Sequence, residues 1–225
     1  MAVSHEGHRQ RMKQRFLKSD LDSFDDLAIL EFLLYFAIPR KDTNPIAHHL
    51  LDHYGSLAAV LEAPVEELRT VEGVTENAAI LLTLVPAVAR QHMIRRAHFG
   101  EPLTTTTKCG EYLVPRFFGE RDEVVWLLCL DAKMVPIDCR LLFRGSVNAA
   151  NISIRKVVEV ALACNATFVI LAHNHTSGLA LPSREDVVTT ERLRTALDAV
   201  GILLCDHIIV AGDDFVSMAD SKLTL

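Results

Sequence analysis

The chain has 225 residues, of which 50% are hydrophobic, enough to bury one or two cores, and its formal net charge of −6 excludes a broad electrostatic footprint for nucleic acid. Its longest apolar run, residues 78–89, is too short to cross a bilayer, and the first thirty residues contain no apolar signal region, so we expect a cytoplasmic protein without membrane association. The five cysteines are odd in number and form no C-x-x-C pair, which argues against a disulfide framework and a thiolate zinc site.

The N-terminal part of the chain is predicted to be entirely helical. A basic helix is expected over residues 8–18, either as a solvated face or as an arm that contacts phosphates. An apolar helix should follow over residues 25–37. A third helix should begin with Asn44 as its N-cap and end at Gly55, a natural C-cap residue.

Residues 55–90 look like a helix-hairpin-helix unit, which binds the DNA backbone through hairpin amides. Gly73 would let these amides approach phosphates closely, but Thr75 occupies the place of the second hairpin glycine. The helix that follows from Glu76 should be kinked or broken at Pro86. We therefore expect a structural unit, with weak, sequence-independent DNA binding as the alternative.

A change of pattern near residue 103 predicts two domains, a helical domain over 1–103 and a second domain over 104–225. The stretch from Phe99 to Thr107 contains Gly, Pro and a run of threonines and looks like a linker. The order strand, strand, helix, strand, helix, strand, strand then predicts an α/β domain in which helices pack against a mixed sheet. These elements are expected over residues 123–131, 134–143, 154–164, 167–172, 184–200, 202–210 and 215–218.

A candidate metal site lies where a buried strand passes through a loop into a helix. Because side chains alternate along a strand, His173 and His175 should face the same way while Asn174 points away. Asp186 follows in the first turn of the next helix and can return to the two imidazoles. Two imidazoles and a carboxylate are a ligand set for a catalytic zinc with an open fourth position. Ser183-x-x-Asp186 is also a good helix start, so this acid has a structural explanation too.

Other histidines carry weaker signals. His207 lies in a strand pattern, and we expect it to be bonded within the sheet rather than to bind metal. His49 and His53 have helical spacing but lack an evident third ligand, so a surface role is favoured.

The joint pattern of His-x-His followed by Ser-x-x-Asp resembles the JAMM motif of MPN domains. The surrounding residues are similar to the bacterial RadC family, and the resemblance covers nearly the whole chain. It is carried by "HNH" with the following Ser-Gly and "PSRED" within residues 173–186, by "DHIIV" at 206–210, and by "HRQRMKQRF" and "PRKDTNPIAHHLLDHYGSL" in the N-terminal half. Thr176 is a departure, since many family members have proline there.

The resemblance implies a specific set of site residues. His173, His175 and Asp186 would hold one Zn²⁺ per chain, and Ser183 would help to bind an oxyanion. The glutamate of the motif, which acts as general base, best matches Glu123 at the start of the first strand. Glu120 is the alternative, and composition and spacing do not choose between the two.

The implied fold is a small helical domain followed by an MPN domain, and the implied activity is hydrolysis of a peptide or isopeptide bond by metal-activated water. Two alternatives stay open: a DNA repair or recombination factor, as the family name suggests, with a structural metal domain, and a non-enzymatic interaction module. The natural substrate and the oligomeric state are not given by the sequence.

Overall fold

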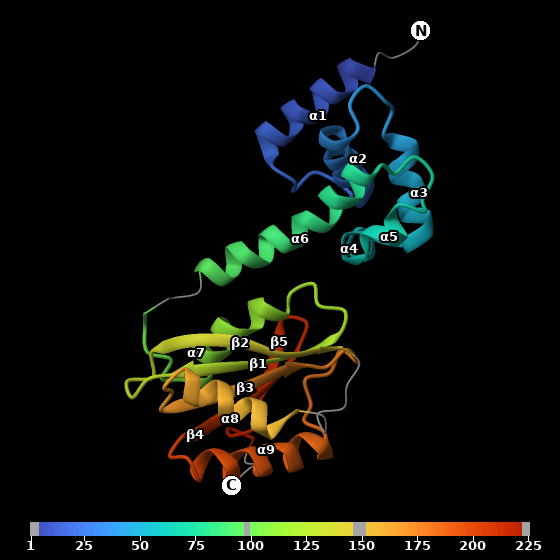
Figure 1. Cartoon of the computed structure of the whole chain (residues 1–225). Coiled ribbons are helices and arrows are strands. Elements are labelled where there is room, and N and C mark those ends of the chain that lie inside the picture. Colours follow the sequence, from blue (N-terminus) through green and yellow to red (C-terminus); the bar gives the residue numbers. More distant parts are fainter. Residues whose placement is uncertain (1–4, 97–99, 146–151, 222–225) are drawn as a thin grey trace. The chain divides into compact units, whose positions relative to one another are not determined.

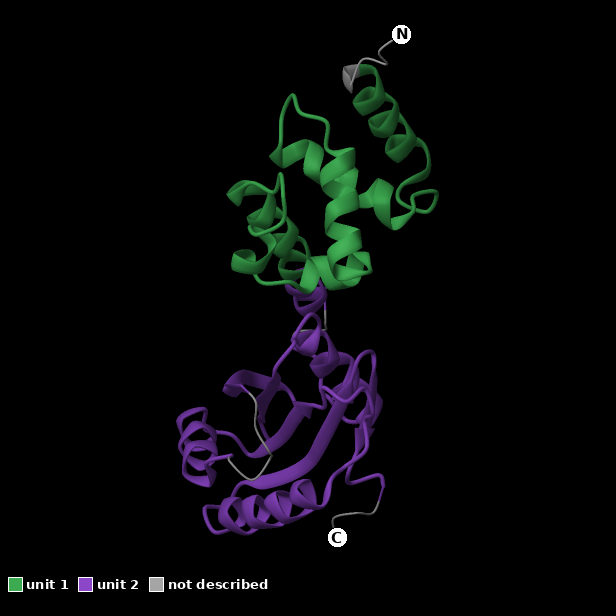
Figure 2. Cartoon of the chain, turned by 90° about the vertical axis from the view of Figure 1, so that its right-hand side faces the viewer, with its two compact units in different colours: residues 1–89 green, residues 90–225 purple. Residues whose placement is uncertain are grey.

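The computed structural model describes residues 5–96, 100–145 and 152–221 and divides the chain into two compact units, residues 1–89 and 90–225 (Figure 2). We refer to them as the N-terminal and C-terminal units. This division falls inside the helix Glu76–Arg96, and the predicted domain boundary near residue 103 stays a prediction. Phe99, which was expected in the linker, lies outside the described residues. Among the helices that are described, none has both the length and the apolar character needed to cross a membrane.

The N-terminal unit is helical, as predicted. Its helices are α1 (His5–Ser19), α2 (Asp26–Ala37), α3 (Asn44–Tyr54), α4 (Leu57–Glu62), α5 (Val65–Leu68) and α6 (Glu76–Arg96), the last of which continues past residue 89 (Figure 1). The apolar faces of α2 to α6 share one core, which includes Leu34, Leu50 and Leu82. Helix α1 packs against α2 through the buried Met12.

Two local predictions in this unit were wrong, one of them only in part. The N-cap of α3 is Thr43, and Asn44 is the first residue of the helix; the Asn44 side-chain Nδ2 donates to the buried carboxylate of Glu31 at 3.3 Å. Helix α6 runs through Pro86, so the predicted break is wrong, and the predicted kink stays a prediction. A proline removes one backbone donor, and here the remaining turns of a 21-residue helix continue on both sides of that loss.

The C-terminal unit is a mixed α/β domain, which confirms the predicted fold class. Its elements are α7 (Thr106–Leu113), the 3₁₀ helix η1 (Val114–Phe117), β1 (Glu123–Leu130), β2 (Pro136–Gly145), α8 (Ile154–Ala163), β3 (Phe168–Asn174), α9 (Arg184–Asp198), β4 (Leu203–Ala211) and β5 (Asp214–Ser217). The strand order is β2-β1-β3-β4-β5, with β3 and β4 parallel and the other pairs antiparallel. Helix α7 was not predicted, because its threonine-rich start reads as a linker; the Thr105 side chain caps it.

Alternation along the strands divides the core of this unit into two layers. On one face, Val125 and Leu171 pack with residues of α8 and α9. On the other face, Ile170 and Ala172 pack with α7 and η1 (Figure 1). Alternation therefore places His173 on the α8/α9 face and Asn174 on the α7 face. The candidate site thus lies at the carboxyl end of β3, beneath the start of α9.

Candidate metal centre

The three residues predicted as metal ligands lie together. The Nε2 atoms of His173 and His175 are 3.0 Å apart. The carboxylate of Asp186 approaches both rings, with Oδ1 3.2 Å from His173 Nε2 and Oδ2 3.4 Å from His175 Nε2. His173 and Asp186 are buried, and His175 is partly exposed. The strand, loop and helix start therefore bring together the donor atoms that their spacing suggested.

The start of α9 fixes Asp186. Ser183 and Asp186 form a capping box: the Ser183 hydroxyl accepts from the Asp186 amide, and the Ser183 amide donates to Asp186 Oδ2 at 2.7 Å. The Ser183 hydroxyl also lies 2.7 Å from Oδ2. The other oxygen, Oδ1, is buried and makes no hydrogen bond within the described part of the chain.

Hydrogen bonds to the opposite ring nitrogens assign the histidine tautomers. His175 Nδ1 lies 3.2 Å from the Leu179 carbonyl, which can only accept, so Nδ1 carries the proton and Nε2 keeps its lone pair. The buried Thr190 hydroxyl donates to the Asp186 carbonyl at 2.6 Å and therefore accepts from Nδ1 of His207 at 2.6 Å. His207 Nε2 must then accept from His173 Nδ1 at 2.8 Å.

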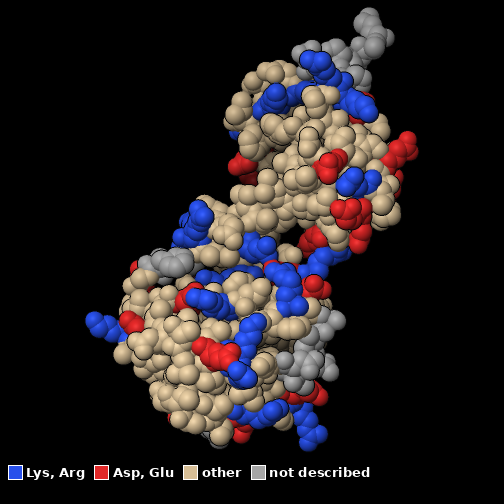
Figure 3. Space-filling model, in the orientation of Figure 1, with Lys and Arg blue, Asp and Glu red and all other residues tan. Residues whose placement is uncertain are grey.

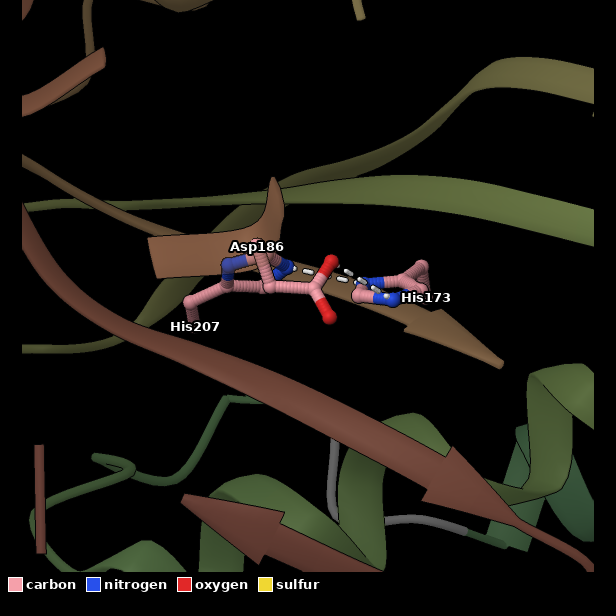
Figure 4. Close-up of side chains that lie close together, drawn as sticks. All are labelled: His173, Asp186 and His207. Carbon is pink, nitrogen blue, oxygen red and sulfur yellow. Dashed lines mark hydrogen bonds and ion pairs between the residues drawn. The ribbon is translucent and has the colours of Figure 1, made fainter. Parts of the chain in front are cut away.

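This chain of bonds leaves His173 Nε2 unprotonated and aimed at Asp186 (Figure 4). Complete burial lowers the pKa of His207 far below the ordinary histidine value, which agrees with a neutral ring that donates at one nitrogen and accepts at the other. With this set of tautomers, both Nε2 atoms and the Asp186 carboxylate would be available to bind a cation.

A second grouping of donor atoms has to be weighed against the predicted one. Among the described residues, His173, Asp186 and His207 also offer ligand atoms within 4.8 Å of one another. In that grouping, however, His207 would use the nitrogen that already accepts from His173. We therefore assign His207 to the support of His173, which agrees with its expected bonding within the sheet, and keep His175 as the third ligand.

The predicted set fits a zinc ion. Ligand atoms about 2.0–2.1 Å from a tetrahedral centre lie roughly 3.3 Å from one another. Here the two Nε2 atoms are 3.0 Å apart, and the Asp186 carboxylate approaches His173 through Oδ1 at 3.2 Å and His175 through Oδ2 at 3.4 Å. The unbonded Asp186 Oδ1 is an acceptor that a cation would satisfy. Neutral imidazole and carboxylate are donors that zinc prefers, and second-shell bonds to the outer imidazole nitrogens are typical of zinc sites.

The two candidates for the general base differ in the contacts that their carboxylates make. Glu123 is the first residue of β1, is partly exposed, and its carboxylate makes no hydrogen bond or ion pair with any of the described residues. Glu120 has a side chain that is only 3% exposed and is held by Arg144, whose Nη2 donates to its Oε1 at 2.9 Å. Glu123 is thus free to act on a substrate, whereas Glu120 belongs to a structural ion pair.

Sequence reasoning did not single out two residues of the site. Thr190 lies one turn beyond Asp186 on α9 and completes the chain of bonds to His173. Asn174 was expected only to point away, and it bonds the backbone around Glu123. The Thr190 spacing of four from Asp186 was a signal on the helix, but its partner His207 becomes a neighbour only through the parallel pairing of β3 and β4.

Known proteins show similarity over most of the chain. The family model described as a RadC-like JAB domain matches residues 103–223. A UPF0758 protein of Ruegeria pomeroyi is 34% identical over 203 residues, which cover 90% of this chain and 91% of that protein.

Proposed function

Because this chain belongs to the RadC family of JAB-domain proteins, we propose that it is a zinc-dependent hydrolase of peptide or isopeptide bonds. The observation that carries the proposal is the convergence of His173 Nε2, His175 Nε2 and the Asp186 carboxylate, which lie within 3.0–3.4 Å of one another. These three residues would hold the ion. When bound, zinc acts as a Lewis acid and lowers the pKa of a water in its open position to about 7.

The residues around the ion would then handle the proton and the substrate. Glu123 accepts a proton from the attacking water and returns it to the leaving amine, a role that contributes roughly 10²–10⁴-fold to rate. Ser183 would assist the oxyanion through its hydroxyl, as the family resemblance implies. In the resting structure that hydroxyl bonds Asp186, so the oxyanion role requires it to exchange partners.

The first experiment measures zinc by mass spectrometry in the purified protein and in His173→Ala and Asp186→Ala variants. We expect one zinc per chain in the parent and its loss in both variants. His48→Ala is a matched control, because His48 is an exposed histidine of α3, far along the chain from the three proposed ligands. Stoichiometric zinc in both site variants would refute the ligand assignment.

The second experiment tests hydrolysis with a library of quenched fluorescent peptides and with lysine-ε-linked isopeptides. We expect Glu123→Gln to retain zinc and to lose hydrolysis of whichever probe the parent cleaves. A parent protein that binds zinc but cleaves neither class would favour a structural or interaction role for the metal domain.

We also propose weak, sequence-independent DNA binding by α1. The N-terminal unit holds thirteen acidic and eight basic residues, and five of those eight lie on α1, where Figure 3 shows them gathered. Arg9 and Arg15 already form hydrogen bonds within the N-terminal unit. Arg9 donates to the Ile38 carbonyl at 2.8 Å, and Arg15 donates to the Ser23 side chain at 3.0 Å. The predicted hairpin around Gly73 should contribute less to DNA binding, because the Val74 amide already donates to the Val71 carbonyl.

The cations of α1 that remain for phosphate contacts are Arg11, Lys13 and Lys18, all exposed. Replacing all three by glutamine should weaken binding to a DNA duplex and reduce its dependence on salt concentration. Lys41→Gln, at an exposed position outside α1, is the control. Absence of binding by the parent at low salt would refute this second function without affecting the first.

A further inference from the structure

We propose that Asn174 is the positioning residue of the general base Glu123 and that it acts by fixing the backbone on both sides of that glutamate. The inference rests on the proposed function, since it assigns a partner to a catalytic group. It concerns the middle residue of the His-Asn-His sequence, whose side chain leaves the metal face entirely.

The carboxamide of Asn174 reaches the start of β1. Its Oδ1 accepts from the Val124 amide at 2.7 Å, and its Nδ2 donates to the Asp122 carbonyl at 3.0 Å. Asn174 is 7% exposed and Val124 is fully buried, so these bonds are shielded from water. Both hydrogen-bonding ends of one amide are thus used on the two residues that flank Glu123.

These two bonds restrain the two soft dihedrals of Glu123. The Asp122 carbonyl belongs to the peptide plane before the Glu123 Cα, and the Val124 amide belongs to the plane after it. Peptide groups are planar, so holding both planes holds φ and ψ of the residue between them. The direction of the Glu123 Cα–Cβ bond follows from these angles.

That direction is toward the candidate metal centre. The regular pairing of β1 with β3 begins at Val125 opposite His173, and the same register extended by two residues sets Glu123 opposite His175. Partners directly opposite in an antiparallel pair share a face, so Glu123 projects on the face of the two histidines. The Asn174 side chain bonds the β1 backbone from the other face, at the point where the pairing of β1 with β3 has ended.

One residue therefore couples the two halves of the site. The chain neighbours of Asn174 are the two histidine ligands, and its bonding partners are the chain neighbours of Glu123. A shift of the β3 end moves the ligands and the base together, which preserves their separation.

The test compares Asn174→Ala and Asn174→Asp with a matched control, Asp131→Ala. Asp131 lies just beyond the opposite end of β1, where its Oδ1 accepts from the amides of Lys133 and Val135 at 2.8 and 2.9 Å. Its loss removes two side-chain bonds to backbone without touching Glu123. Asn174→Asp keeps the acceptor for Val124 and replaces the donor to Asp122 by a second acceptor, and it tests the same contact if Asn174→Ala folds poorly.

We expect Asn174→Ala to retain zinc and KM while kcat falls about 10–100-fold, as for a misplaced catalytic group. Asn174→Asp should lower kcat as well, because the Asp122 carbonyl loses its donor. The Val124 amide should exchange with solvent faster in Asn174→Ala and not in Asp131→Ala, measured by nuclear magnetic resonance. In a Glu123→Gln background, Asn174→Ala should not lower the residual rate of hydrolysis further, because the group that it positions is already gone.

A readout without substrate separates failure of this inference from failure of the proposed function. With Co²⁺ in place of zinc, Glu123→Gln should alter the visible absorption bands, and Asn174→Ala should reproduce the change without adding to it. If Glu123→Gln alters the bands and Asn174→Ala does not, the positioning role is overturned and the proposed function stands. Absence of metal binding, or bands insensitive to Glu123→Gln, overturns the proposed site or base and the inference with it.

Discussion

Removing one buried hydroxyl should weaken metal binding without touching any ligand. In Thr190→Val, a side chain of nearly the same shape replaces the hydroxyl that bonds both the Asp186 carbonyl and His207 Nδ1. His207 is fully buried, so its Nδ1–H loses the one acceptor that the described residues give it. Leaving a buried donor without a partner costs about 1–3 kcal/mol in the free energy of unfolding.

The effect on metal binding follows from the tautomer of His207. Without Thr190, His207 is no longer held with its proton on Nδ1, and a proton on Nε2 would face His173 Nδ1. His173 would then carry its own proton on Nε2, the atom that has to bind the ion. Losses of second-shell partners typically reduce metal affinity by roughly 10–100-fold, which corresponds to about 1.4–2.7 kcal/mol.

The assay is zinc competition against a chromophoric chelator, together with urea unfolding of the metal-free protein. Thr195→Val is the control, because Thr195 bonds the Glu191 carbonyl on the same helix in the same way but lies exposed and contacts no histidine. A zinc affinity of Thr190→Val equal to that of Thr195→Val would refute the proposed chain of bonds from Thr190 to His173.

Three further predictions follow from the same structure. Glu120→Gln should lower the free energy of unfolding by about 1–3 kcal/mol, because it removes the charged partner of Arg144. The kcat of this variant should be unchanged. A loss of kcat without a loss of stability would indicate that Glu120 is the general base. Gly73→Ala should destabilise the N-terminal unit in urea more than Gly55→Ala, since both glycines have positive φ but a Cβ at Gly73 would lie 2.8 Å from Ile46. An equal loss of stability in the two variants would show that the positive φ alone, and not the contact with Ile46, causes the destabilisation. Removal of zinc by a chelator should lower the melting temperature, because an ion at 100 times its Kd stabilises the folded state by about 2.7 kcal/mol; an unchanged melting temperature would contradict a site formed only on folding.

The sequence predicted most elements because each has a local signal. The period-two alternation of β3 placed two histidines on one face, and Ser183 marked the start of α9. Helix α7 was missed because its first turn is made of threonines, which favour extended structure, and its stability comes from burial against the sheet. The predicted Asn44 cap was wrong by one residue, and the Asn44 side chain bonds a buried carboxylate thirteen residues earlier, a partner that local propensity does not include.

The support of the site was hidden for a different reason. Thr190, His207 and His173 form a chain of hydrogen bonds in space, yet His207 is 34 residues from His173 and 17 from Thr190. They meet because β4 pairs with β3 in parallel and α9 packs over both. Strand order is a property of the whole sheet, so no local spacing in the sequence predicts such a chain of hydrogen bonds.

The helix cap and the metal ligand, which compete as explanations of Asp186 in the sequence, are complementary in the structure. The cap uses one carboxylate oxygen: Oδ2 accepts from the Ser183 amide and lies 2.7 Å from the Ser183 hydroxyl. Oδ1 is then fixed in position, buried and unbonded, 3.2 Å from a histidine nitrogen that carries a lone pair. A cap alone would place this second oxygen in water or against a donor. Its burial beside an imidazole nitrogen, without a hydrogen-bond donor among the described residues, is an arrangement that a cation would stabilise, and the cap holds the carboxylate in position for it.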